Sequence, residues 1–178
     1  MKKSAIIIAV LTVLTMNLYC LQAQERIGIA VYQDVNLALG GDSEHGNSGF
    51  TTDIRTRIKL EAMERKYGYI VLGIVFEYAD LNSTELGVFY RYGAELGYVF
   101  NTPINNLKIS PTIGYGILSR QYDYARRSWE FSGEVFYNIT KNISVNALGT
   151  FMERTDLPNK SFGFNGYIGI QYSFSTKL

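Results

Sequence analysis

The chain has 178 residues, and its 17 Lys and Arg against 16 Asp and Glu leave it nearly neutral. Near-neutrality disfavours a nucleic-acid partner, which selects a basic surface, and the length suits one domain. Cys20 is the only cysteine, and it lies in the N-terminal segment described next. A chain without that segment contains neither a disulfide nor a cysteine ligand for a metal.

The first predicted element is a secretory signal peptide over residues 1–23. Lys2 and Lys3 precede an apolar run over residues 5–14, and a more polar stretch then ends in a small residue, which is the order typical of such signals. We therefore expect an exported mature domain over residues 24–178. Because Lys2 and Lys3 leave with the signal, 15 basic residues remain against 16 acidic ones.

Two alternatives for this segment are disfavoured. An uncleaved membrane anchor needs about 20 apolar residues, and the run here is shorter. Lipidation at Cys20 is disfavoured because Tyr19 stands where lipoprotein signals carry a small residue.

Eight segments of alternating character follow, and the second, residues 52–62, shows the pattern most clearly. Its even positions carry apolar or hydroxyl side chains, and its odd positions carry only charges: Asp53, Arg55, Arg57, Lys59 and Glu61. Successive side chains of a strand point to opposite faces, so one face is apolar and the other is charged. Slipping the register by one residue would turn three cations toward lipid, at about 2–4 kcal/mol each. The alternation therefore specifies which face points outward.

In chain order, strands are predicted at residues 27–39, 52–62, 69–79, 86–99, 107–119, 128–138, 143–153 and 162–174. On the first, we expect an outward face that Gln33 interrupts and that consists of Ile27, Ile29, Val31, Val35 and Leu37. On the last, Tyr167 and Gln171 are predicted to point inward. Behind a signal peptide, eight such passes predict an all-β protein, an eight-stranded antiparallel up-and-down transmembrane β-barrel.

The connections between these strands alternate in character. Those after the second, fourth and sixth strands are short, whereas those after the first and seventh are longer or more polar. With both mature termini in the periplasm, the short connections are periplasmic turns, and the loops at residues 40–49, 80–85, 120–127 and 154–161 face outside. The periplasmic interface would then carry an aromatic girdle of Tyr98, Phe100, Tyr137, Tyr172 and Phe174.

The whole mature chain resembles the small eight-stranded outer-membrane barrels of the OmpA transmembrane-domain and OmpX type. In its last strand, Gly169, Tyr172 and Phe174 resemble the terminal signal by which such barrels engage the barrel-assembly machinery. The chain departs from the commonest form because residues 175–178 follow the final aromatic. The resemblance implies a bacterial outer-membrane location, with outer-membrane lipid and the assembly machinery as partners.

The inward positions define the candidate functional residues, a charge network in the lumen. It contains seven basic and six acidic side chains: Asp53, Arg55, Arg57, Lys59, Glu61, Glu77, Arg91, Glu95, Lys108, Arg120, Glu130, Glu134 and Arg154. Buried charges persist only when they are paired and hydrogen-bonded. Because an eight-stranded barrel is just wide enough inside for side chains to fill, we expect a salt-bridged plug. The alternative is a narrow channel for ions or small solutes, gated by pairs that exchange partners.

Inward glycines gather on the third to fifth strands, at Gly73, Gly87, Gly93, Gly97, Gly114 and Gly116. Glycine in a strand often marks a close approach, and we expect these positions to make room for the long Arg and Glu side chains. A small-ligand pocket is the alternative reading of the same positions.

No arrangement in the sequence predicts an enzyme. The only histidine, His45, lies in a Gly- and Ser-rich loop beside Ser43 and Glu44, whereas a nucleophile, a base and an orienting group must converge in space. No metal-ligand cluster, phosphate-binding loop or nucleotide fingerprint is found, so neither metal nor cofactor is expected. We expect a structural or surface-interaction protein whose extracellular loops bind a partner of unknown identity. A secreted lipocalin-like ligand-binding barrel is the remaining alternative, and it predicts charges outside and apolar residues within.

Overall fold

The computed structural model describes residues 24–41, 51–80, 87–120, 125–155 and 162–175. The predicted signal peptide and the loop that contains His45 lie outside these ranges. The described chain forms β1 (Gln24–Asp34), α2 (Val35–Leu39), β2 (Asp53–Arg65), β3 (Gly68–Asp80), β4 (Val88–Asn101), β5 (Leu107–Arg120), β6 (Arg126–Asn138), β7 (Ile143–Glu153) and β8 (Phe162–Ser175).

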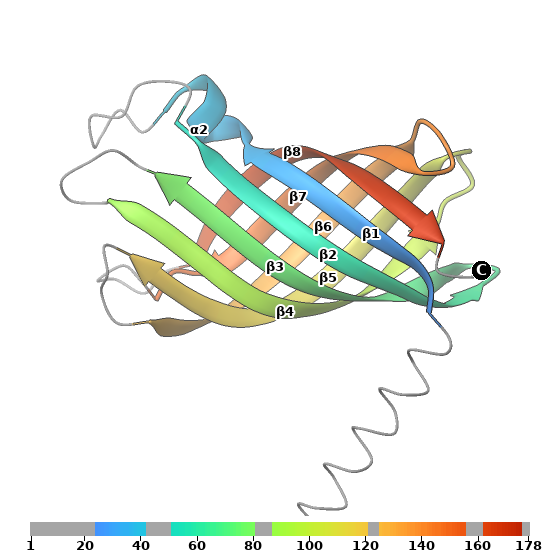
Figure 1. The fold of residues 1–178 in the computed structure, drawn as a ribbon, viewed down its shortest axis with the longest axis horizontal. Coiled ribbons are helices and arrows are strands. Elements are labelled where there is room, and N and C mark those ends of the chain that lie inside the picture. The colour runs from blue at the N-terminus through green and yellow to red at the C-terminus, as the bar shows by residue number, and fades with distance from the viewer. Residues whose placement is uncertain (1–23, 42–50, 81–86, 121–124, 156–161, 176–178) are drawn as a thin grey trace, which may run out of the picture.

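The eight strands form a closed barrel in sequence order, with every neighbouring pair antiparallel (Figure 1). β1 closes the ring, since Ile29 pairs with Ile58 of β2 on one side and with Tyr172 of β8 on the other. A closed ring leaves no unpaired edge, and this is the condition for strands to lie in lipid. The predicted eight-stranded antiparallel barrel is confirmed.

The two ends of the barrel differ. The short turns between β2 and β3, β4 and β5, and β6 and β7 lie at one end, together with the start of β1 and the end of β8 (Figure 1). We call this the turn end. The opposite end carries α2, and we call it the α2 end.

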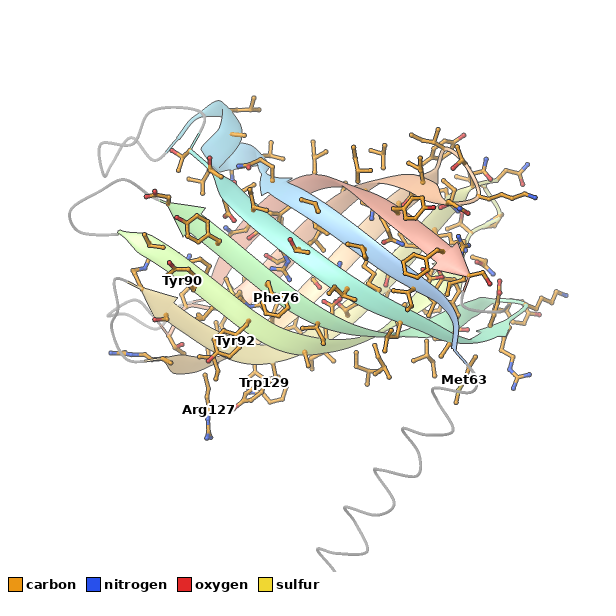
Figure 2. The ribbon with its side chains drawn as sticks, in the orientation of Figure 1. Met63, Phe76, Tyr90, Tyr92, Arg127 and Trp129 are labelled. Atoms are coloured by element: carbon orange, nitrogen blue, oxygen red, sulfur yellow. The ribbon has the colours of Figure 1, made fainter. Side chains whose placement is uncertain are left out.

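The outer surface of the barrel is apolar and rich in aromatic rings. Phe76 on β3, Tyr90 and Tyr92 on β4, and Trp129 on β6 all point away from the barrel (Figure 2). On β2 the exposed Ile54 and Ile58 alternate with buried charged residues. Because the charges lie within and the apolar side chains outside, the arrangement is the reverse of a soluble lipocalin-like barrel.

The first strand ends earlier than the alternation predicts. β1 stops at Asp34, and its carboxylate accepts a hydrogen bond of 2.9 Å from the backbone N–H of Leu37, which caps the short helix α2. The prediction that Val35 and Leu37 continue the outward face of a strand is therefore wrong. Neither this helix nor any other in the described part of the chain is long and apolar enough to span a membrane.

A second departure from the alternation occurs near the end of β2. Met63 has a φ of 57°, and the pairing with β3 shifts between Ala62 and Arg65. This is a β-bulge, in which one strand carries an extra residue and changes direction. Ala62 is therefore buried, although the period-two pattern places it outward.

The interior of the barrel contains apolar clusters as well as charges. At the α2 end, Leu37 packs against the cluster of Ala79, Phe89, Leu118 and Met152. At the turn end, the buried cluster consists of Tyr69, Val71, Val99 and Phe136. A further cluster on β1, β7 and β8 consists of Ala30, Tyr32, Leu148 and Tyr167. Apolar side chains of the first two clusters therefore narrow the lumen toward both ends of the barrel.

Candidate functional site

The charged centre of the lumen is built mainly by two strands on opposite walls. β2 carries Arg55, Arg57 and Lys59 on its inner face, and β6 carries Glu130 and Glu134. In a closed ring of eight strands, β2 and β6 are four strands apart in either direction. An ion pair between them therefore crosses the full width of the lumen.

The first group of ion pairs surrounds Arg55. Its guanidinium donates to Glu130 at 2.5 Å and to Glu77 on the neighbouring β3 at 3.0 Å. Arg91 of β4 lies 2.6 Å from Glu130 and 3.8 Å from Glu77, so both acids are shared between the two arginines. The Arg55 guanidinium also lies over the ring of Tyr167, 5.5 Å from its centre. Two cations and two anions balance in this group.

The second group is centred on Glu134. Its carboxylate accepts from Arg57 at 2.9 Å and from Lys59 at 2.6 Å, both across the lumen from β2. Arg57 also contacts Glu95 of β4, with Nε 2.8 Å and Nη2 2.7 Å from the same carboxylate oxygen. Two cations and two anions balance here as well. The eight side chains of these two groups therefore carry no net charge.

Neutral side chains complete the hydrogen bonding of these groups. The hydroxyl of Tyr32 and the amide of Asn146 donate to Glu134 at 2.5 and 2.6 Å, and Tyr167 donates to Glu77 at 3.0 Å. Gln171 accepts from Lys59 at 2.7 Å. Tyr32 and Asn146 are members that the sequence-based list of charges omits. Both could have been found from the sequence, because the period-two alternation of β1 and β7 places Tyr32 and Asn146 on the inward face.

The four cations of these two groups are all buried, and Arg55 and Arg57 have no exposed surface. Taking a charge out of water is costly, and only matched charges with further hydrogen bonds offset that cost. Not every polar atom is satisfied: Arg55 Nε, Arg91 Nε and Glu95 Oε2 are buried without a hydrogen-bond partner within the described structure. These atoms mark the least satisfied part of the network.

The other five predicted members lie toward the two mouths. At the α2 end, the guanidinium groups of Arg120 and Arg154 lie over the ring of Phe89, 5.6 and 5.7 Å from its centre, and Asp53 is buried. At the turn end, Lys108 lies over the ring of Tyr69 at 4.7 Å. Glu61, also at the turn end, accepts a long hydrogen bond of 3.5 Å from Gln171. The predicted set therefore separates into a paired centre and two mouths.

The inward glycines have two different neighbours. A Cβ on Gly73 would lie 2.5 Å from Oε1 of Glu95, so this glycine makes room for an ion-paired side chain, as predicted. Gly93 and Gly116 instead pair with each other across β4 and β5, and a Cβ on either would meet backbone of the neighbouring strand below 3 Å. Here the glycines permit close approach of two strands.

Two small voids remain near the turn end of the lumen. They have volumes of about 20 and 10 Å³, and both are lined by Arg26, Glu61, Tyr69 and Lys108. A void of this size holds about one water molecule. In the described residues, no group of three or more His, Cys, Asp or Glu side chains is arranged to hold a metal ion.

The three residues of the predicted assembly signal lie on β8. Tyr172 and Phe174 are exposed on the outer surface, with ring centres 6.4 Å apart. Gly169 is buried, and a Cβ there would lie 2.3 Å from the carbonyl oxygen of Val31 and 2.5 Å from the ring of Tyr32. Gly169 therefore has a packing role of its own, because it leaves space for the tyrosine that hydrogen-bonds Glu134.

No protein-family model and no curated protein sequence matches the chain. Solved structures do match, among them two of Ail, the attachment invasion locus protein of Yersinia pestis. Ail in a phospholipid bilayer nanodisc aligns with a TM-score of 0.56 at 13% identity, and crystalline Ail with a TM-score of 0.50 at 14% identity. Each alignment covers 85% of this chain and 99% of Ail. The likeness concerns the fold, which is that of an eight-stranded outer-membrane barrel.

Proposed function

We propose that the chain is an integral outer-membrane β-barrel with a closed lumen, and that it serves as a structural or surface-interaction protein without catalysis. The observation that carries this proposal is the set of ion pairs between β2 and β6. Arg55 with Glu130, and Arg57 and Lys59 with Glu134, bridge opposite walls and occupy the space that a conduit needs.

The apolar layers support the same proposal. An ion that entered from either mouth would have to pass an apolar cluster before it reached the balanced groups of buried charges. Breaking one buried pair by removing a partner costs about 3–5 kcal/mol in other proteins, because a charge is left uncompensated. A closed and rigid barrel suits a protein whose contacts are made by its loops. Ail, which has the same fold, is named for attachment and invasion.

A narrow gated channel is the second candidate, and the sharing of acids favours it. Glu130 lies between Arg55 and Arg91, and Glu134 lies between Arg57 and Lys59, so each acid already has an alternative partner. Exchange between partners requires no charge to travel far. The two candidates therefore differ in whether these pairs exchange in the native barrel.

Single-channel conductance of the refolded mature chain in a planar bilayer separates them. We expect a silent bilayer from protein whose folded state is verified by its migration on unheated gels. Reproducible small current steps that change in the Arg57→Ala variant would replace the closed-lumen proposal by the channel. The exposed-residue variant Lys66→Ala is the control, since Lys66 lies on a turn outside the lumen.

We propose further that both mature termini, and hence the turn end, face the periplasm. The mature chain has no cysteine, so one introduced cysteine gives an unambiguous label. In intact cells, a membrane-impermeant maleimide should label Leu39→Cys at the α2 end and not Asn105→Cys on the β4–β5 turn. Both residues are exposed, so the opposite labelling pattern would reverse the orientation.

Two predictions about biogenesis belong to the same proposal. Residues 1–23 act as a cleaved signal, and the mass of the purified barrel should correspond to a chain that begins near Gln24.

Gly169, Tyr172 and Phe174 act as the signal for the barrel-assembly machinery. Phe174→Ala should reduce incorporation into the membrane of cells while the purified variant still refolds in detergent, and equal incorporation would remove this role from Phe174.

A further inference from the structure

The described charges are distributed unequally between the two ends of the barrel. At the turn end the cations of the described ranges are Arg26, Arg65, Lys66, Lys108 and Lys141, and the anions are Glu25, Glu61 and Glu64. At the α2 end the described cations are Arg120, Arg126, Arg127 and Arg154, and the anions are Asp34, Asp53, Asp80 and Glu153. Five cations against three anions leave an excess of two positive charges at the turn end, whereas the described charges of the α2 end balance.

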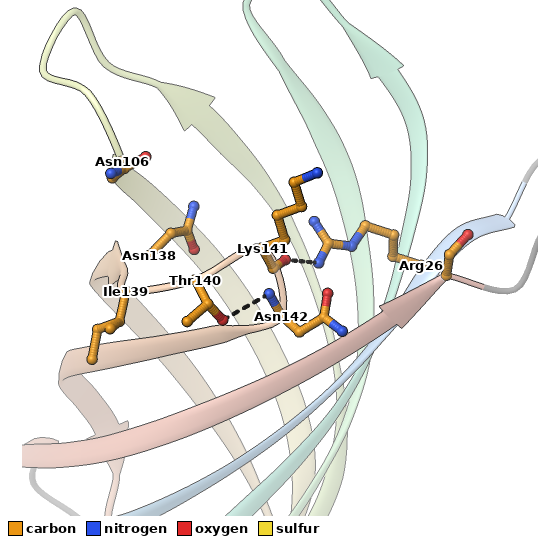
Figure 3. Close-up of a pocket in the computed structure, with 8 residues that line it drawn as sticks. Arg26, Asn106, Asn138, Ile139, Thr140, Lys141 and Asn142 are labelled. Atoms are coloured by element: carbon orange, nitrogen blue, oxygen red, sulfur yellow. Dashed lines mark hydrogen bonds between the residues drawn. The ribbon is translucent and has the colours of Figure 1, made fainter.

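Part of this excess lines an open hollow of about 550 Å³ at the turn end (Figure 3). Arg26 reaches it from β1, and the β6–β7 turn supplies Lys141 beside Thr140. The amide side chains around it are those of Asn106, Asn138 and Asn142. Ile139, which is 60% exposed, adds an apolar wall.

The cations of this hollow are not neutralised as those of the lumen are. Each of the four cations in the two ion-pair groups lies within 2.7 Å of a carboxylate oxygen. Arg26 instead donates to the backbone carbonyl of Lys141 (Figure 3), and neither Arg26 nor Lys141 forms an ion pair with any carboxylate whose side chain is described. A guanidinium has five N–H donors, and Arg26 makes one described hydrogen bond while it also lines the two small voids beside Glu61.

The chemistry of the lining selects among anions. An arginine fork matches a planar carboxylate, and an ammonium adds a point charge beside it. Three asparagine amides present acceptors as well as donors, which suits a ligand that carries N–H groups and C=O groups next to its charge. A bare phosphate offers the asparagine oxygens no N–H donor, so only the N–H groups of these amides could pair with it. A peptide that ends in a free carboxylate satisfies both kinds of group.

We infer that this hollow binds the free carboxylate end of a peptide segment, with Arg26 and Lys141 holding the carboxylate and the asparagine amides pairing with the adjoining peptide groups. Under the proposed function, the compartment that supplies this peptide is the periplasm. The binding site itself does not depend on the orientation of the barrel.

The test is a titration of the refolded mature barrel in detergent, followed by NMR or calorimetry. The probe is acetyl-Ala-Ala with a free carboxylate, and its C-terminal amide and inorganic phosphate are the comparison ligands. We expect the amide to bind at least about tenfold more weakly, since it loses a charge-assisted hydrogen bond. Phosphate should compete less well than the free acid.

Three variants locate the binding. Arg26→Gln and Lys141→Gln should each weaken binding of the free acid by about tenfold, whereas Lys66→Gln should change it less than twofold. Lys66 is the matched control, because it is an exposed cation at the same end that does not line the hollow. Lys141→Gln leaves the carbonyl that Arg26 contacts in place, so it tests the site even if Arg26→Gln folds poorly.

Several outcomes overturn the inference. Equal binding of the free acid and its amide would show that the site does not recognise the carboxylate. The absence of any binding would show that the hollow is not a peptide site. An equal loss in Lys66→Gln means that net charge alone attracts the peptide, and phosphate that competes as well as the free acid means a general anion site. The cysteine labelling described above is a separate experiment, so a reversed orientation would change the compartment and leave the peptide titration as it stands.

Discussion

At the scale of single residues, Arg57 shows how the lumen distributes its charges. It is the only described cation within ion-pair distance of Glu95, whereas Glu134 also has Lys59. Removing Arg57 therefore leaves one acid without a counter-charge and the other with a remaining partner. We therefore expect loss of Arg57 to raise the electrostatic energy of the buried Glu95 carboxylate more than that of any other lumen side chain.

We expect Arg57→Ala to lower the free energy of unfolding by about 3–5 kcal/mol, measured by urea unfolding of the barrel in detergent. Lys66→Ala, which removes an exposed cation, should change it by less than about 0.5 kcal/mol. Replacing both partners by apolar residues of similar size, Arg57→Met with Glu95→Met, should recover most of the loss. An unchanged midpoint in Arg57→Ala would mean that water, not Arg57, compensates Glu95.

At the scale of elements, α2 closes one mouth of the lumen with a single side chain. Leu37 packs on the cluster that includes Phe89 and Met152, whereas Leu39 of the same helix is 80% exposed. Comparing substitutions at the two leucines therefore separates the contribution of packing against the barrel from that of helix propensity.

We expect Leu37→Ala to lower the free energy of unfolding by about 1–2 kcal/mol, because a partly buried leucine loses part of the 1.5–3 kcal/mol of a fully buried one. Leu39→Ala should leave stability unchanged within about 0.5 kcal/mol. Both are measured by the same urea unfolding. Equal effects of the two substitutions would indicate that the helix, and not its contact with the barrel, matters.

Sequence reasoning predicts the strands of this barrel well and fails at the helix for an identifiable reason. Val35, Leu37 and Leu39 continue the period-two pattern of β1, so periodicity alone cannot tell a strand from a short helix there. The competing signal is Asp34, a residue type favoured at the start of a helix. The Asp34 carboxylate accepts a hydrogen bond from the backbone N–H of Leu37, and this bond favours the helix over a continued strand.

The inward position of the lumen charges follows from alternation, but their pairing does not. The row of Arg55, Arg57 and Lys59 faces inward because lipid would penalise the opposite register. Which acid each cation meets depends on the stagger of the closed ring, which places Glu134 of β6 opposite β2. Charge alternation also does not predict that apolar side chains such as Leu118 point inward and pack inside the barrel.

At the scale of the whole molecule, the outer surface is a band of apolar side chains, and the single Trp of the chain lies within it. Trp129 is 48% exposed, and its ring lies 4.8 Å from that of Tyr115. In a soluble protein such a ring would face water. In a barrel that spans a bilayer it faces lipid.

We therefore expect the fluorescence of Trp129 in vesicles to be quenched by lipids with brominated acyl chains and to be nearly insensitive to aqueous acrylamide. The unfolded chain in urea provides the control, and there acrylamide should quench strongly. Strong acrylamide quenching of the folded protein in vesicles would contradict a membrane-spanning barrel.

The arrangement of ion pairs along the chain also bears on the order in which the barrel forms. Of the eight paired side chains, β1–β4 contribute four cations and two anions, and β5–β8 contribute only Glu130 and Glu134. Among these eight, the first half of the chain has two more cations than anions, so Lys59 has no described carboxylate partner, and Arg55 and Arg57 each have only one of two, until β6 is in place. Glu130→Gln with Glu134→Gln should therefore slow folding into vesicles, and an unchanged rate would exclude this effect. The ion pairs of Glu130 and Glu134 with β2 therefore join the two halves of the sequence, so we expect both halves to assemble together and not one after the other.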